Sequence, residues 1–250
     1  MTPSFEILYE DNHMLGVIKP SGILSQGDGS KTADMLSLIG NFIKIRDQKP
    51  GNVFVGLVHR LDRNVGGTMV FAKTSKGASR LSESMRNGDF FKGYFVLTKN
   101  RLSPKEGFLT NCLWKDEKQN RVYERKDGKL SRLYYKFLGS DSNLNLYFAI
   151  PITGRAHQIR VQFALAGAPL VGDRKYGPEL ATGYQVGLWS GVIRVAHPVR
   201  RDEHILLTSV PKGEVWNQYT LLEQHLSPFL NELDVSYYER LCSEEVFHGI

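Results

Sequence analysis

The sequence predicts an α+β protein in which a single domain is built on a largely antiparallel mixed sheet flanked by helices. Short apolar strands come in runs and do not alternate regularly with helices, which is typical of antiparallel sheets. Apolar residues make up 41% of the 250 residues and charged residues 23%, an ordinary composition for a globular chain with a substantial core. We expect this domain to occupy residues 1–213 and an acidic, helical appendage to occupy residues 214–250.

The N-terminal half predicts four strands and two helices. Two short strands are expected within residues 5–18, each closed by turn residues. Helical spacing of apolar residues predicts a helix over 32–46. A second helix is expected over 76–87, with Ser75 as its N-cap and Gly88 at its end. The other strands of this half are expected over 54–61 and 68–73, joined by a turn at 64–67.

Strands dominate the C-terminal half. One strand is expected over 91–98, and several antiparallel strands within 107–150. A helix over 155–166 follows, with Thr153 as its cap. Later strands are expected near 192–197 and 204–210, and helix over 215–245.

Charge is unevenly distributed along the chain. The whole protein carries a net charge of +6, but residues 214–250 hold seven acidic residues and one basic residue. Residues 1–213 therefore hold 31 basic and 19 acidic residues, a net charge of +12. Such a body would attract a polyanion, with nucleic acid as the obvious candidate, although a basic solvated surface without a partner has the same composition.

The cysteines and the N-terminus indicate the cellular setting. Cys112 and Cys242 form no CxxC or Cys/His ligand pattern, so we expect two buried thiols in a reducing, cytoplasmic compartment. The N-terminus has no basic region followed by an apolar stretch, so no signal peptide is expected. No apolar run reaches the length of a membrane span.

The segment 59–67, with the sequence HRLDRNVGG, places one carboxylate between two guanidinium groups. Positive charge from Arg60 and Arg63 favours the ionised form of Asp62. Such a carboxylate can be a salt-bridge partner, a metal ligand, a general base or a nucleophile, and these residues alone leave the four roles open. Its expected place in a loop at a strand end favours a functional role.

A second segment, 152–160, has the sequence ITGRAHQIR. Arg160 is expected at the edge of the apolar face of the helix. Because an unpaired guanidinium is costly to bury, we expect a carboxylate partner and predict that it is Asp62. A structural ion pair without any chemistry is the alternative.

Two further segments carry weaker signals. In KGYFV at 92–96, strand alternation places Lys92 and Tyr94 on one face. A tyrosine there can stack on a nucleic-acid base while the cation binds phosphate, although packing in a core is the more ordinary role. The segment 167–177, GAPLVGDRKYG, combines tight turns with a basic cluster that could contact a phosphate backbone.

In this order, the four segments resemble the RluA-type pseudouridine synthases. The family's His-Arg-Leu-Asp, followed by a glycine turn and an apolar strand ending in Ala-Lys, is similar to 59–73, and Lys92 and Tyr94 match its Lys-x-Tyr. Its Thr-Gly-Arg-x-His-Gln-Ile-Arg is matched at 153–160, and its Gly-x-Pro-Leu-x-Gly-Asp-x-x-Tyr-Gly at 167–177. The resemblance covers about residues 5–211.

The resemblance implies an isomerase that converts specific uridines in structured ribosomal or transfer RNA to pseudouridine, in a basic central cleft. Asp62 matches the catalytic aspartate, Arg160 the basic residue that pairs with it, and Tyr94 the residue that stacks on the flipped base. Arg60 matches the arginine that fills the space left in the RNA. Other residues expected to bind substrate are His59, Arg63, Lys92, Arg155, His157 and Gln158.

The same resemblance implies no metal and no organic cofactor, because the isomerisation has no redox step. RNA is the expected partner, and we expect a cytoplasmic monomer with no membrane contact and no obligate protein partner. The small RNA-binding domain that precedes many relatives is not expected, because the match begins near residue 5.

The chain departs from the family pattern in three places. Asn64–Gly67 stands where the family often has Thr-Ser-Gly, Trp189 stands where a histidine is usual, and Gln162 replaces a frequent histidine. No group assigned to the chemistry is lost, so we expect the departures to affect substrate preference more than catalysis.

Three other classes of protein fit parts of this pattern. A protein kinase needs Asp directly after His-Arg, but Leu61 intervenes, and no GxGxxG loop is present. A metal-dependent hydrolase could use scattered histidines and Asp173, but these lack a tight ligand spacing. A catalytically inactive RNA-binding protein of the same fold is the remaining alternative, and the presence of Asp62 favours an enzyme.

Overall fold

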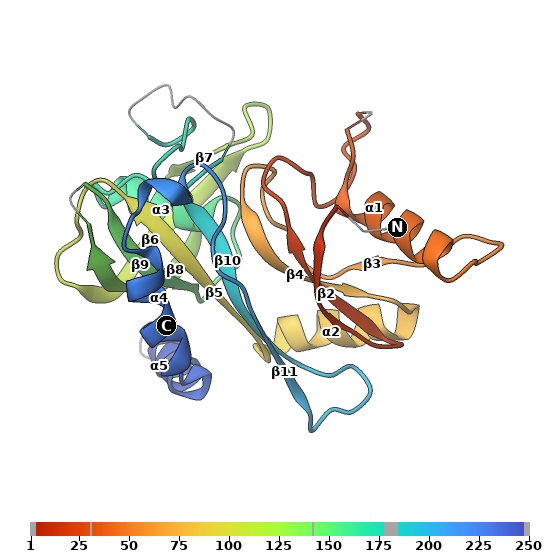
Figure 1. Cartoon of the computed structure of the whole chain (residues 1–250). Coiled ribbons are helices and arrows are strands. Elements are labelled where there is room, and N and C mark those ends of the chain that lie inside the picture. The colour runs from red at the N-terminus through yellow and green to blue at the C-terminus, as the bar shows by residue number, and fades with distance from the viewer. Residues whose placement is uncertain (1–3, 31, 142, 178–184, 248–250) are drawn as a thin grey trace. The chain divides into compact units, whose positions relative to one another are not determined.

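The computed structural model describes residues 4–30, 32–141, 143–177 and 185–247 (Figure 1). The chain divides into two compact units. Unit 1 is Met1–Lys92 with Trp189–Pro211, and unit 2 is Gly93–Leu188 with Lys212–Ile250. Strands β5 (Phe90–Thr98) and β10 (Leu188–Ala196) each have residues in both units.

Unit 1 is built on a mixed sheet. Its other strands are β1 (Glu6–Glu10), β2 (Met14–Lys19), β3 (Gly56–Leu57), β4 (Gly66–Ala72) and β11 (His204–Thr208). Their order is β1-β2-β4-β10-β11, and β3 pairs with the end of β4. The pairs are antiparallel except for β4 with β10, which run parallel. The prediction of a largely antiparallel mixed sheet with flanking helices is confirmed.

Two helices of unit 1 are capped by hydrogen bonds from their flanking residues. Helix α1 (Met35–Arg46) begins three residues later than predicted, because the Asp34 side chain accepts the amide hydrogen of Ser37 at 3.2 Å. Helix α2 (Ser75–Asn87) is capped by Thr74, whose Oγ1 accepts from the amide of Gly77 at 3.0 Å, so the predicted cap, Ser75, was wrong by one residue. Gly88 ends α2 with a positive φ of 84°, as predicted.

The strand predicted over 54–61 is much shorter in the structure. Only Gly56 and Leu57 pair with β4. Beyond them the amide of Val70 in β4 donates to Nε2 of His59 at 3.0 Å, so a side chain takes the place of a backbone acceptor. The chain therefore leaves the sheet before residue 62, and the carboxylate of interest lies in a loop.

Unit 2 is an antiparallel sheet, as predicted for residues 107–150. Its strands after β5 are β6 (Glu106–Asp116), β7 (Arg121–Glu124), β8 (Lys129–Ser140) and β9 (Asn145–Pro151). The order is β5-β9-β8-β6-β7. Helix α3 (Gln158–Leu165) packs against β6 and β9.

Helix α3 begins at Gln158, three residues later than predicted. Its N-cap is His157, which has a left-handed φ of 50° and makes no capping bond through its side chain. Thr153 does not cap the helix, because its Oγ1 instead donates to Oε1 of Gln158 at 2.9 Å and accepts from the amide of Arg132. Residues 153–158 thus form a turn that is tied to β8.

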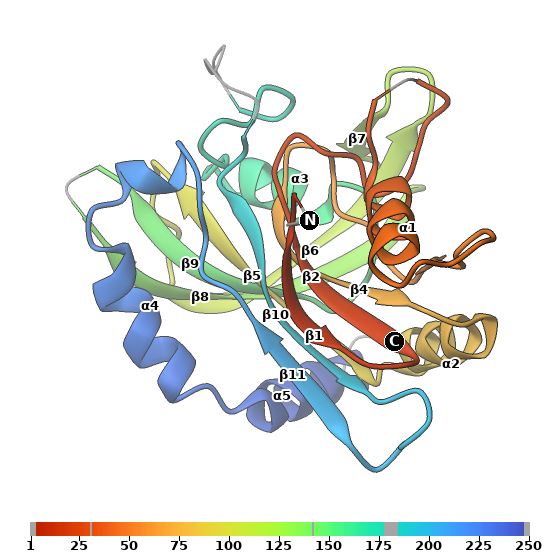
Figure 2. The same ribbon diagram turned by 45° about the vertical axis from the view of Figure 1, so that its right-hand side comes forward.

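The C-terminal segment is helical, as predicted, with α4 (Leu222–Asn231) and α5 (Val235–Phe247) after a short 3₁₀ turn. Helix α4 runs beside β8 (Figure 2), and aromatic side chains of the segment pack on the sheet of unit 2. The ring of Phe229 lies 4.7 Å from that of Phe148, and the ring of Tyr238 lies 5.6 Å from the same phenylalanine. These contacts make the segment part of the core of unit 2, while the domain boundary at residue 213 stays a prediction.

Neither cysteine forms a disulfide and both are only partly buried, so the prediction of buried thiols was wrong. Cys112 lies in β6, most of whose residues are half-buried. Within the residues placed by the structure, no helix combines the length and apolar character needed to cross a membrane.

We predict that Asp11→Asn destabilises unit 1 in a pH-dependent way. Nε2 of His197 lies 2.5 Å from the Asp11 carboxylate, which also accepts from the amides of His13 and Met14 at 2.8 Å. Burial alone would raise the pKa of Asp11, but the amide of His13, the His197 ring and the amide of Met14 lower it to about 2. The cost of the substitution should be about 1–3 kcal/mol near neutral pH.

The ionised form binds these donors only in the folded state, so its stabilisation is present above the ordinary pKa of 3.8 and is lost as the pH falls towards about 2. Urea unfolding of both proteins across this range measures the difference. It should shrink below about pH 4. Asp89→Asn, at an exposed site, is the control, and an Asp11→Asn effect that is constant with pH would contradict the prediction.

Candidate active site

Asp62 lies in the loop between β3 and β4 of unit 1. Its side chain is half-buried, whereas Arg60 and Arg63 on either side of it are exposed. The amide of Val65 donates to the carbonyl of Asp62 at 3.0 Å, which closes a tight turn directly after the carboxylate. The carboxylate is therefore presented from a turn, with a guanidinium side chain on each flank.

The C-terminal side of this turn is held by the segment that follows β2. The amide of Gly22 donates to the carbonyl of Arg63 at 2.7 Å, and Nε of Arg63 donates back to the carbonyl of Gly22 at 3.0 Å. The hydroxyl of Ser21 donates to the carbonyl of Asn64 at 2.9 Å. Three hydrogen bonds thus fix the two residues that follow Asp62.

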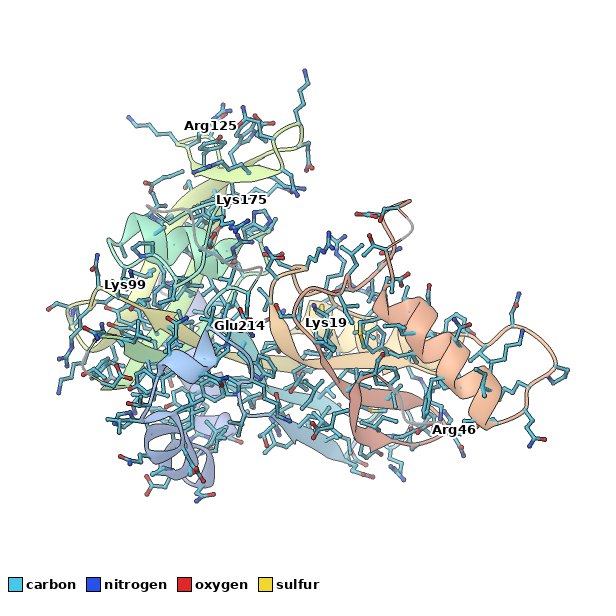
Figure 3. The ribbon with its side chains drawn as sticks, turned by 45° about the horizontal axis from the view of Figure 1, so that its top comes forward. Lys19, Arg46, Lys99, Arg125, Lys175 and Glu214 are labelled. Atoms are coloured by element: carbon cyan, nitrogen blue, oxygen red, sulfur yellow. The ribbon has the colours of Figure 1, made fainter. Side chains whose placement is uncertain are left out.

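Lys19 adds a buried cation to this arrangement (Figure 3). Its side chain is fully buried, and Nζ donates to the carbonyls of Pro20 at 2.9 Å, Ile23 at 2.6 Å and Arg63 at 3.3 Å. An ammonium group has three hydrogens, and each has an acceptor here. Lys19 therefore ties the end of β2 to the backbone beside Asp62.

Burial lowers the pKa of Lys19 to about 7, and the negative charge of Asp62 counters this only in part. The Lys19 ammonium group and the Asp62 carboxylate are therefore close enough for the charge of Asp62 to act on the pKa of Lys19. From the sequence, Lys19 was expected only among the turn residues that close a strand, although a lysine directly before Pro-Ser-Gly was a visible signal.

Gly66 and Gly67 bring the turn close to β10. Gly67 has a φ of 118°, and a Cβ at this position would overlap the backbone of Ser190. A Cβ at Gly66 would overlap the ring of Trp189. Trp189, one of the departures from the family pattern, therefore lies in close contact with the glycine turn.

His59 and Lys92 complete the basic groups of unit 1 that were predicted to bind substrate. Burial, with a smaller effect from Lys92, lowers the pKa of His59 to about 3, so its ring is neutral at physiological pH. Burial also lowers the pKa of Lys92. Because Nε2 of His59 accepts from Val70, its hydrogen is assigned to Nδ1, which has no partner among the residues that the structure describes.

In unit 2, Arg160 is buried and forms a two-point ion pair with Asp173. Nε and a terminal nitrogen of Arg160 lie 2.7 Å and 2.8 Å from the two carboxylate oxygens. Burial would raise the pKa of Asp173, but Arg160 and the amides of Lys175 and Tyr176 hold it below its usual value. The sequence placed Arg160 at the edge of the helix face and missed Asp173 as a partner, although Asp173 stood in the fourth segment.

The start of α3 is tied to the fourth segment through Tyr176. Nδ1 of His157 lies 2.7 Å from the Tyr176 hydroxyl, which also accepts from the amide of Val122 in β7 at 2.8 Å. The left-handed backbone of His157 is held by this contact, and such strain is common at functional sites. From the sequence, Tyr176 was known only as a member of the fourth segment, and Asp173 only as a member of that segment and as a metal ligand in the hydrolase alternative.

Two further predicted residues lie beside this turn. Oε1 of Gln158 accepts from Thr153 and from the amide of Arg155, and its Nε2 donates to the carbonyl of Arg132, so this side chain holds the local backbone. Arg155 is exposed, and the ring of Tyr94 in β5 is 8% exposed. Substrate-binding roles for Gln158 and Arg155 stay predictions.

Unit 1 gathers five of the predicted site residues and unit 2 the other five. Those of unit 1 are His59, Arg60, Asp62, Arg63 and Lys92. Those of unit 2 are Tyr94, Arg155, His157, Gln158 and Arg160. The predicted ion pair between Asp62 and Arg160 joins the two sets and stays a prediction. Over the part of the chain that is placed, no group of three or more His, Cys, Asp or Glu residues could hold a metal ion.

Solved structures show which class of fold this is. The human RNA pseudouridylate synthase domain containing 4 superimposes with a TM-score of 0.69 and 20% identity, over 86% of this chain and 91% of that one. The human RNA pseudouridylate synthase domain containing 1 gives a TM-score of 0.65 at 19% identity, over 85% and 86%. The chain therefore has the pseudouridine synthase fold.

Sequence comparison gives the family. The model described as RNA pseudouridylate synthase matches residues 13–165, so the chain belongs to that family. Ribosomal large subunit pseudouridine synthase C of Buchnera aphidicola (subsp. Acyrthosiphon pisum, strain APS) is 36% identical over 174 residues, which cover 68% of this chain and 54% of the relative. The protein of the same name from Vibrio vulnificus (strain CMCP6) is 31% identical over 216 residues, 83% of this chain and 66% of the relative.

A third relative is an uncharacterized RNA pseudouridine synthase of Bacillus subtilis (strain 168), which is 30% identical over 205 residues. They cover 80% of this chain and 67% of that protein. The chain spans about half the length of the first relatives it matches, 54% to 58%.

We predict that Lys19→Met changes how stability depends on pH. Because the folded protein lowers the pKa of Lys19 from 10.5 to about 7, the unfolded chain binds the proton more tightly between these values. Stability contributed by this group should therefore rise as the pH increases through that window. Loss of the three donors should also cost about 1–3 kcal/mol.

Urea unfolding of both proteins at several pH values from about 7 to about 10 measures this difference. The free energy of unfolding of the wild type, minus that of Lys19→Met, should increase with pH. Lys44→Met, at an exposed position of α1, should give a difference that does not change. If the difference for Lys19→Met stays constant or falls as the pH rises, burial does not lower the pKa of Lys19.

Proposed function

We propose that the protein is an RNA pseudouridine synthase that isomerises uridine through Asp62. The observation that carries the proposal is the placement of Asp62, the aspartate of the His-Arg-Leu-Asp segment, in a turn fixed by Lys19 and its neighbours. A reacting carboxylate must be held in one direction to contribute to catalysis. The match to the RNA pseudouridylate synthase family supports the proposal.

The proposed reaction is an isomerisation in which every atom of the nucleotide is kept. Asp62 attacks the target nucleotide, the bond between the ribose carbon and N1 of uracil breaks, and the base turns. The ribose carbon then bonds to carbon 5, the bond between Asp62 and the nucleotide breaks and frees the carboxylate, and the proton of carbon 5 is lost while N1 gains one. A carboxylate can act as such a covalent catalyst, and the uridine must first leave the RNA stack to be reached.

The remaining site residues are proposed to serve this reaction. Arg160 would pair with Asp62 and Tyr94 would stack on the extruded base. The exposed Arg60 would occupy the gap left in the RNA. Lys92 and His157 would bind the RNA chain around the target nucleotide.

The hairpin of β6 and β7 supports RNA binding by unit 2. Trp114 and Tyr123 face each other across the two strands, and each is 37% exposed. The guanidinium of Arg125 lies 4.3 Å from the Trp114 ring (Figure 3). Exposed aromatic rings among cations are suited to stacking on bases and contacting phosphates.

The charges of this hairpin favour an anionic partner. Its carboxylates are already engaged: Asp116 with backbone amides, Glu117 with Lys115, Glu124 with Asn111 and Asp127 with Arg125. Four cations have no carboxylate partner among the residues that the structure describes. These are Lys118, Arg121, Lys126 and Lys129.

We propose large-subunit ribosomal RNA as the first substrate to test, because relatives of this chain are named for that subunit. We also propose that the protein acts as a monomer, in the cytoplasm, where its two cysteines would stay reduced. Mapping pseudouridine in total RNA from cells with and without the gene identifies the modified position.

We predict that Asp62→Asn abolishes pseudouridine formation and leaves RNA binding nearly unchanged. An amide is a far poorer nucleophile than a carboxylate, so the single-turnover rate should fall by about a thousandfold or more. The rate is measured on ribosomal RNA fragments and the affinity by titration. Asp202→Asn, at an exposed site of unit 1, should keep the wild-type rate. Continued isomerisation by Asp62→Asn would exclude the mechanism.

We predict that Trp114→Ala weakens RNA binding without slowing the reaction at saturating protein. Loss of one stacking ring should raise the Kd by roughly five- to tenfold, at the lower end of such effects. Tyr237→Ala removes another exposed ring, 48% exposed, from the acidic C-terminal helix and should leave the Kd unchanged. Equal Kd values for Trp114→Ala and the wild type would show that the β6–β7 hairpin is not part of the RNA-binding surface.

A further inference from the structure

The N-terminal side of the Asp62 turn is held by a single serine. Ser25 is buried, and its Oγ lies 2.7 Å from the carbonyl oxygen and 3.0 Å from the amide nitrogen of Leu61. A hydroxyl has one hydrogen to donate and lone pairs to accept with, so it can bind both groups at once. The thioether of Met69, at 3.7 Å, is a much weaker acceptor than the carbonyl.

This contact replaces a missing strand partner. Strand β3 ends at Leu57 and β4 begins at Gly66, so Leu61 lies outside both. Buried backbone amides and carbonyls need hydrogen-bond partners, and the side chain of Leu61 is itself buried. Ser25 supplies both partners to the residue that directly precedes Asp62.

Ser25 is itself held in place by the start of α1. The carbonyl of Leu24 accepts the amide hydrogen of Met35, the first residue of that helix, at 2.9 Å. Leu24 also forms a β-bridge with Asp34. The backbone that carries the Ser25 hydroxyl is therefore held by α1. The position of α1 in turn restricts where the hydroxyl holds Leu61 in the Asp62 loop.

Residues 19–25 thus hold the backbone on both sides of Asp62. Gly22, Ser21 and Lys19 bind the residues after it, and Ser25 binds the residue before it. We propose that Ser25 is a positioning residue, which aims the Asp62 carboxylate at the target nucleotide without touching the RNA. This inference rests on the proposed function of Asp62.

The expected consequence is a loss of rate at constant affinity. With Ala at this position, Leu61 keeps neither hydrogen bond and the Asp62 peptide can shift. A displacement of about 1 Å in a reacting group lowers the rate by roughly 10- to 100-fold. RNA binding should not change, because the exposed Arg60 and Arg63 and the surface of unit 2 are untouched.

The test compares Ser25→Ala and Ser25→Thr with Thr74→Ala. Threonine keeps the hydroxyl, and Thr74→Ala removes a hydroxyl that accepts from the backbone amide of Gly77 at the start of α2, outside the Asp62 loop. Each variant is measured for thermal stability, RNA affinity and single-turnover rate, at a temperature where all are folded. Ser25→Ala should lose roughly 10- to 100-fold in rate, whereas Ser25→Thr and Thr74→Ala should stay within about threefold of the wild type.

Amide hydrogen exchange gives a second readout that does not need activity. In Ser25→Ala the amide of Leu61 should exchange about five- to tenfold faster, while Thr74→Ala should leave it unchanged. An unchanged rate or unchanged exchange in Ser25→Ala overturns the inference, as does an equal loss of rate in Thr74→Ala. A wild-type protein without synthase activity would instead refute the proposed function, and with it the role assigned to Ser25.

Discussion

The site in unit 1 depends on one buried cation. Lys19 has no exposed surface, and its ammonium group binds three backbone carbonyls, one of them next to Asp62. A buried charge is tolerated only where its hydrogen-bonding capacity is met, and here the acceptors come from two loops. The same contacts that satisfy Lys19 therefore join these loops and fix the backbone beside the carboxylate.

A comparable constraint operates in unit 2, where Arg160 is buried in the first turn of α3. Its two hydrogen bonds to Asp173 offset the cost of removing both charges from water. The backbone amides of Lys175 and Tyr176 donate two further hydrogen bonds to the Asp173 carboxylate. The ion pair thereby joins the segment 167–177, which contains Asp173, to the segment 152–160, which contains Arg160. In both units a buried basic side chain thus fixes the backbone that carries predicted site residues.

Trp189, a departure from the family pattern, packs closely against the glycine turn. The ring of Trp189 occupies the space that a side chain at position 66 would need, and its Nε1 donates to Ser209 at 2.9 Å. Gly67 passes against the backbone of Ser190 with a positive φ. The bulky Trp189 in β10 therefore requires a glycine at position 66 of the turn.

The sequence by itself determined the α+β class and the order of most helices and strands, and it predicted Asp62 as the central carboxylate, because these follow from local periodicity and short motifs. It misjudged details that depend on one side chain competing with another, such as Thr74 over Ser75 as the cap of α2 and His59 ending β3 early. Only the tertiary structure decided that Asp173 binds Arg160 and that Lys19 and Ser25 hold the Asp62 turn. Lys19 and Ser25 lie 44 and 36 residues from the loop residues they bind, and no local pattern specifies such partners before the chain folds.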